Sequence, residues 1–198
     1  MMYCMKLIIR ILPLFCFLFL FSCHSKNIEG TQEEKDSYDT IFVYYHKGFY
    51  ETSTRTPCSE MKELFEDEVV SETIAIDKDD YDLIYSYLSE CSNKGTELTP
   101  CEARIYVRAS AYDLCIDDCI ICACDTNEKE IPVDNRALYL ILSLSGYYNY
   151  LDSLDLQFDR LIEEYGMPSN YEKRTSKPID WDDEEEYDDY RKVALVRE

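Results

Sequence analysis

The order of strand-like and helix-like segments constrains the fold of this 198-residue chain more than any other feature of its sequence. Runs rich in β-branched and aromatic residues, which favour strands, stand at 41–45 and 103–109, and a meander of short strands follows over 112–133. Two helix-patterned segments, 137–144 and 154–165, come next. Strands in runs followed by helices predict an α+β fold rather than a parallel sheet.

The region between the first two runs adds further expected elements. A second strand is expected at 49–54, a short helix at 59–68 and an alternating strand at 70–76. A longer helix is expected over 77–91, because an aspartate suited to cap a helix begins it and apolar residues recur at helical spacing. We therefore expect an antiparallel sheet, in part a meander, packed with about three helices in a single domain over 39–170.

The first 22 residues have the pattern of a secretory signal peptide. They carry Lys6 and Arg10 but no acidic residue, and the run 11–21 is apolar throughout. As one helix, residues 7–21 would span only about 22 Å at ~1.5 Å per residue, which is shorter than the ~30 Å hydrocarbon core of a bilayer. The pattern therefore predicts an export signal rather than a membrane-spanning helix.

The end of this run has a more specific pattern. Leu20-Phe21-Ser22-Cys23 resembles the lipobox of bacterial lipoproteins, in which an aliphatic, a tolerated and a small residue precede an invariant cysteine. The resemblance implies that residues 1–22 are removed and that Cys23 carries the lipid that anchors the chain to a membrane of the cell envelope. The polar segment 23–38 is then expected to be a flexible tether, with the domain facing the periplasm or the cell surface.

Acidic residues strongly outnumber basic ones. The net charge of −21 becomes −23 once residues 1–22 are removed, because that segment holds two basic residues and no acid. Such a charge disfavours nucleic acid and is compatible with a basic protein partner. The block 180–189 is almost entirely acidic, so we expect 171–198 to be a disordered tail. Within it, Trp181 is a candidate for contacting a partner.

Seven cysteines follow Cys23, and the compartment of an exported domain favours disulfides. Cys91 and Cys101 flank a loop that contains glycine and proline, so they are the first choice for a bridge. If a turn follows Asp117, the cysteines at 115, 122 and 124 share one face of a hairpin. The disulfide candidates are Cys91, Cys101, Cys115, Cys122 and Cys124.

The cluster from Cys115 to Cys124 also suggests a different class of function. Three thiolates on one face could hold a metal or take part in redox chemistry. Zinc prefers four ligands, however, and the sequence has the single C-x-x-C spacing Cys119–Cys122 instead of the two such pairs usual in zinc sites. We therefore expect no metal and no cofactor, and we keep a thiol or metal protein as the alternative hypothesis.

The sequence contains no motif of a known catalytic class, so no catalytic residue is assigned. Tyr147, Tyr148 and Tyr150 either form a partner-binding surface or pack into the core, since a tyrosine ring combines a large apolar area with a polar tip. The leading hypothesis is a non-enzymatic interaction domain in the envelope, such as an immunity-type or surface-binding lipoprotein.

Overall fold

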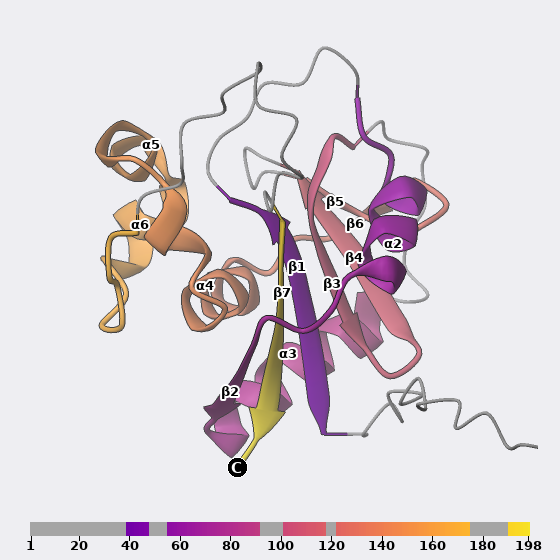
Figure 1. Ribbon diagram of the computed structural model, residues 1–198, viewed down its shortest axis with the longest axis horizontal. Helices are drawn as coiled ribbons and strands as arrows, with labels where there is room; N and C mark the ends of the chain where they lie inside the picture. Colours follow the sequence, from indigo (N-terminus) through magenta and orange to yellow (C-terminus); the bar gives the residue numbers. More distant parts are fainter. Residues whose placement is uncertain (1–38, 48–54, 92–100, 118–121, 175–189) are drawn as a thin grey trace, which may run out of the picture. The chain divides into compact units, whose positions relative to one another are not determined.

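The described residues of the computed structural model form a seven-stranded mixed sheet (Figure 1). They comprise residues 39–47, 55–91, 101–117, 122–174 and 190–198, all within one structural unit, Asp36–Glu198. The strands are β1 (Thr40–His46), β2 (Glu72–Ile76), β3 (Ala103–Ala109), β4 (Tyr112–Asp117), β5 (Ala123–Cys124), β6 (Glu130–Ile131) and β7 (Tyr190–Arg197). Their order is β2-β7-β1-β3-β4-β5-β6, with β2 and β7 parallel and every other neighbouring pair antiparallel.

Five α-helices and one 3₁₀ turn are present among the described residues. They are α2 (Cys58–Asp67), α3 (Lys78–Cys91), α4 (Asn135–Leu144), η1 (Tyr147–Tyr150), α5 (Ser153–Phe158) and α6 (Arg160–Tyr165). The prediction of an α+β domain with a largely antiparallel sheet is confirmed. The strand expected at 49–54 lies outside the described residues.

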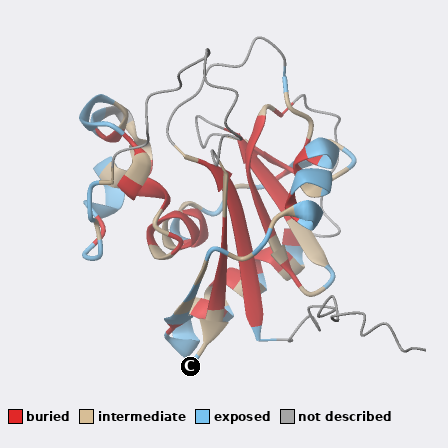
Figure 2. Ribbon diagram, viewed as in Figure 1, coloured by how far each residue is buried: buried red, intermediate tan, exposed pale blue. Residues whose placement is uncertain are grey.

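Helices cover both faces of the sheet, so the domain has two cores (Figure 2). Alternation along β1 explains why: Val43 and Tyr45 point to the core under α3 and α4, whereas Phe42 and Tyr44 point to the core under α2. All seven residues of β1 are buried, as expected of a strand covered on both sides.

The C-terminal segment differs most from its expected state. The disordered tail predicted for 171–198 is wrong for 190–198, because β7 lies between β1 and β2 in the sheet. Val193 pairs with Val43 of β1 and with Glu72 of β2, and it is fully buried. The reason is that the acidic composition ends at residue 189, and the apolar run that follows can bury its side chains on both faces of a sheet.

The helix expected over 154–165 is two short helices. Asp159 has extended backbone angles, with φ −73° and ψ 117°, and its side chain accepts hydrogen bonds from the backbone N–H groups of Leu161 and Ile162. An aspartate in this position caps a new helix instead of continuing the old one. Asp152 caps α5 in the same way.

Candidate binding site and cysteine cluster

The tyrosine-rich turn η1 follows α4, where Gly146 adopts a left-handed conformation with φ 75° and ends the helix. Tyr147 and Tyr148 are buried in the core under α3 and α4, and the ring of Tyr147 packs edge-to-face on Tyr45 at 5.5 Å. The core-packing alternative therefore holds for these two tyrosines, which are not free to bind a partner. Trp181, the other candidate, lies outside the described residues.

Tyr150 is only half-buried, and two arginines surround it. Its hydroxyl accepts a hydrogen bond from Arg174 at 3.4 Å and another from Arg191. The guanidinium carbon of Arg191 also lies 5.6 Å from the centre of the Tyr150 ring, within the range of a cation–π contact. Tyr150 thus joins the segment after α6 to the start of β7, two regions remote from it in sequence.

A polar pocket of about 180 Å³ opens beside this tyrosine. Its charged and amide-bearing lining residues are Glu72, Asn149, Asn170, Glu172, Arg174 and Arg191. Arg191 pairs with Glu72, yet its Nε atom is buried without a hydrogen-bond partner among the described residues. Because the two arginines and two glutamates balance formally, the pocket suits a small dipolar group rather than a strongly charged one.

The sequence does not predict this pocket, because its lining residues come from segments far apart in the chain. Arg174 and Arg191 were both placed in the expected tail, and only the pairing of β7 with β2 brings Arg191 next to Glu72. The one local signal was the apolar run Val193-Ala194-Leu195, which follows the acidic block and has the composition of a strand.

A disulfide joins Cys58 at the start of α2 to Cys115 in β4, with Cα atoms 5.7 Å apart. The expectation that Cys115 is bridged is confirmed, but its partner, Cys58, was not among the candidates. The predicted Cys91–Cys101 bridge is wrong, since neither cysteine forms a disulfide. Cys91 belongs to the core under α3 and α4, whereas Cys101 belongs to the core under α2.

Three free thiols lie near this disulfide, on the α2 side of the sheet. The prediction that Cys115, Cys122 and Cys124 share one face is confirmed, because all three contribute to the α2 core. The Sγ atoms of Cys101 and Cys122 are 3.6 Å apart. Hydrogen bonding to Cys124, together with burial, raises the pKa of the Cys101 thiol, and burial raises that of Cys122. Both groups are therefore protonated at neutral pH and are weak nucleophiles.

Metal binding was the other possibility raised by this cluster. No group of three or more histidine, cysteine, aspartate or glutamate side chains in the described part of the chain is arranged to hold a metal ion. His46, at the end of β1, is buried and packs edge-to-face on Tyr190 at 5.1 Å. Tyr190 belongs to β7, which pairs with the edge of β1 opposite to β3.

Exposed apolar and acidic side chains occur together on and after the last two helices, in what we call the α5–α6 surface. It consists of the exposed apolar residues Leu154, Tyr165 and Met167 together with the acidic residues Asp152, Asp155, Glu163 and Glu164. Leu154 is 59% exposed and Met167 is 46% exposed, although both side chains are large and apolar. These exposed apolar side chains are available to contact another protein.

No helix among the described residues is both long and apolar enough to span a membrane. Comparison with known proteins adds no assignment: no protein-family model matches the chain, and no curated protein or solved structure is similar enough to match it.

Proposed function

We propose that this protein is a lipid-anchored, non-enzymatic binding protein of the bacterial envelope, and that it engages a basic protein through the α5–α6 surface. The observation that carries the proposal is the concentration of exposed apolar side chains there: three of the five large apolar residues exposed in the described part of the chain lie at Leu154, Tyr165 and Met167. The other two, Leu64 and Val69, lie beside α2.

Charge supports a basic partner. Four carboxylates accompany the apolar residues of the α5–α6 surface, and the mature chain would carry a net charge of −23. Acidic groups at the edge of an interface attract a basic protein and raise its association rate, while buried apolar side chains supply most of the binding free energy. Binding should therefore weaken as the salt concentration rises.

The test compares two matched double variants of the mature chain. Glu163→Gln with Leu154→Ser alters the α5–α6 surface, and Glu60→Gln with Val69→Ser makes the same kinds of change beside α2. Both glutamates stand in the first turn of their helix, and both apolar side chains are exposed. Chemical cross-linking in intact envelopes, followed by mass spectrometry, identifies the partner and the residues that touch it.

We expect a basic protein cross-linked near α6, lost in the first variant and kept in the second, and released by high salt. Equal loss in both variants, or a partner that is acidic, would overturn the proposed docking surface. Circular dichroism of each variant separates loss of binding from loss of fold.

Lipid attachment is tested separately, by labelling cells that express the full chain with a palmitate analogue. The lipobox resemblance predicts label on the wild-type chain and none on Cys23→Ser. Cys16→Ser is the control, because it removes a cysteine from the segment expected to be cleaved off. Equal labelling of all three chains would refute the lipid anchor and leave the docking surface untouched.

A further inference from the structure

The chain holds a pair of thiols whose geometry prepares them for a covalent bond. The Sγ atoms of Cys101 and Cys122 lie 3.6 Å apart, and a disulfide requires them to approach to ~2.05 Å. We propose that Cys101 and Cys122 form a second disulfide, which ties the residues before β3 to the residues before β5 once the protein meets an oxidant.

Hydrogen bonds to the main chain hold both cysteines in place. The Cys101 carbonyl accepts from Nε of Arg55 at 2.9 Å, and nearby the Ala103 N–H donates to the Thr56 carbonyl at 2.9 Å. The Cys122 N–H donates to the Asp117 carboxylate at 3.1 Å. These hydrogen bonds hold the two cysteines near each other on the same side of the sheet, and the bridge forms when the two sulfurs close the remaining gap.

The Cys101 thiol also hydrogen-bonds to Cys124, but exposure favours Cys122 as its bridging partner. Cys124 is fully buried in β5, opposite Cys115 in the strand ladder, where an oxidant cannot reach it. Cys122 is partly exposed, so its sulfur can reach and attack an external disulfide first. Cys91 is excluded because it lies in the core on the other face of the sheet.

The reaction is a two-step thiol–disulfide exchange with a disulfide-bearing oxidant, such as a protein oxidase or glutathione disulfide. The Cys122 thiol loses its proton and its sulfur attacks one oxidant sulfur, which forms a mixed disulfide and releases one thiolate. The Cys101 sulfur, once deprotonated, then attacks the Cys122 sulfur and releases the second thiolate. Two cysteines are oxidised, one oxidant disulfide is reduced to two thiols, and the two protons pass to the leaving sulfurs.

Burial of the two thiols also determines how fast the disulfide forms. Burial raises the pKa of Cys122, so little thiolate is present near neutral pH and oxidation accelerates as the pH rises. The pair therefore has the properties of a structural bridge formed slowly, or with a catalyst, and not those of a catalytic redox centre.

The experiment uses the full chain, reduced and then equilibrated with a glutathione redox buffer under native conditions. Free thiols are blocked with N-ethylmaleimide, and the unreduced protein is digested and analysed by mass spectrometry. We expect a Cys101–Cys122 peptide in addition to the Cys58–Cys115 peptide. The new bridge should form faster at pH 9 than at pH 7, because the thiolate is the attacking species. Cys124→Ser should retain the new bridge, and Cys122→Ser should lose it.

Maleimide on both Cys101 and Cys122 at full oxidation would overturn the proposal, as would a bridge from either sulfur to any other cysteine. Because the wild-type map alone decides between these outcomes, the test does not depend on how well the variants fold.

Discussion

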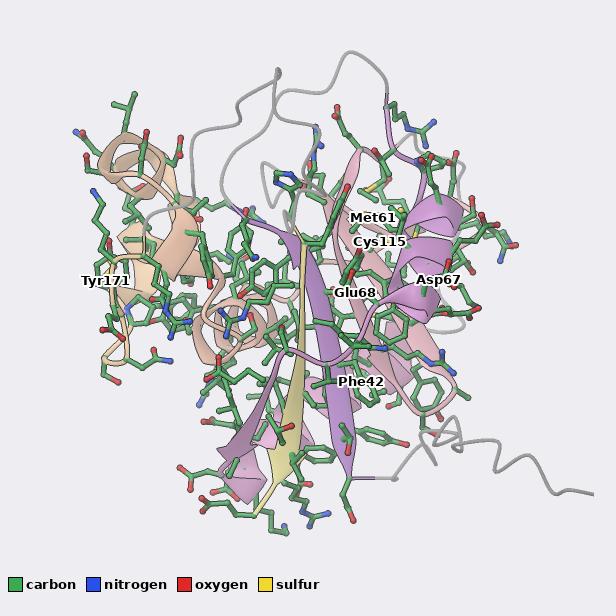
Figure 3. The ribbon with its side chains drawn as sticks, viewed as in Figure 1. Phe42, Met61, Asp67, Glu68, Cys115 and Tyr171 are labelled. Carbon is green, nitrogen blue, oxygen red and sulfur yellow. A yellow bond between two sulfur atoms is a disulfide. The ribbon has the colours of Figure 1, made fainter. Side chains whose placement is uncertain are left out.

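The two faces of the sheet are held together by different kinds of interaction. On one face, α3 and α4 each bury five residues, and the core there is built mainly from aliphatic and tyrosine side chains. On the other face, α2 buries only Cys58, Met61 and Phe65. Figure 3 shows Met61 and Cys115 between this helix and the sheet. A helix with so little apolar area gains little from burial alone, so additional links are needed to hold it.

Covalent and charged links of this kind are present on the α2 face, and two of them involve buried groups. One is the Cys58–Cys115 disulfide. The other is Lys192 of β7, a buried lysine whose Nζ donates to the carbonyls of Phe65 and Glu68 at the end of α2 and lies 4.0 Å from the centre of the Phe65 ring. A cation at a helix C-terminus is favourable because the carbonyl ends carry partial negative charge. The comparison indicates that apolar area secures one face, whereas covalent and charged links secure the other.

The largest effect is expected from removing β7, because this strand serves both faces. Val193 and Leu195 belong to the α3–α4 core and Ala194 to the α2 core. Burial of a side chain such as valine or leucine contributes about 1.5–3 kcal/mol, and truncation also exposes the edges of β1 and β2. A chain that ends at residue 189 should therefore lose its cooperative thermal transition and its near-ultraviolet circular dichroism.

A chain that lacks only Glu198 is the control, since that residue is exposed at the end of β7. If the chain ending at 189 melted cooperatively near the temperature of the full chain, β7 would not be part of the sheet and both faces would be independent of it.

The second-largest effect is expected from removing the Cys58–Cys115 disulfide, and it should be confined to the α2 face. Replacing Cys58 and Cys115 together by alanine removes the bridge across 57 residues and should lower the free energy of unfolding by about 2–4 kcal/mol. Hydrogen exchange should increase first at the amides of α2, while those of α3 and α4 change less. Cys91→Ala is the control, because it removes a buried sulfur from the other face without breaking a covalent bond. A uniform increase over all helices would contradict the separation of the two faces.

The smallest effect distinguishes two buried tyrosines, one on each face. Tyr106, on the α2 face, donates a hydrogen bond to Asp113 at 3.1 Å, whereas the hydroxyl of Tyr148 has no partner among the described residues. At neutral pH, Tyr106→Phe should destabilise by about 1 kcal/mol, and Tyr148→Phe should be neutral or stabilising. Chemical denaturation of the two variants measures both values.

The same pair predicts a dependence on pH. Burial raises the pKa of both hydroxyls above the value of ~10 that they have in the unfolded chain. The folded state therefore binds more protons than the unfolded state above that pH, so stability falls as the pH rises beyond it. Each phenylalanine variant should lose less stability than the wild type between neutral and strongly alkaline pH. Parallel curves for all three chains would show that these hydroxyls ionise freely in the folded protein.

The sequence by itself determined the elements whose signals are local. β-branched and aromatic runs predicted β1, β3 and β4, and apolar spacing predicted α3 and α4. Helix ends are local features too, because the left-handed turn at Gly146 and the capping carboxylate of Asp152 depend on only a few neighbouring residues.

Only the tertiary structure decided the place of β7, the partner of Cys115 and the polar pocket. Each depends on the approach of residues far apart in the chain: Val193 reaches Val43, Cys58 reaches Cys115, and Arg191 reaches Glu72. The composition of 171–198 as a whole concealed β7, because the acidic block 180–189 outweighed the short apolar run that follows it. Spacing could not reveal the bridge, because a disulfide requires two sulfurs on the same face of the sheet, and which face a cysteine occupies is set by strand register and helix packing.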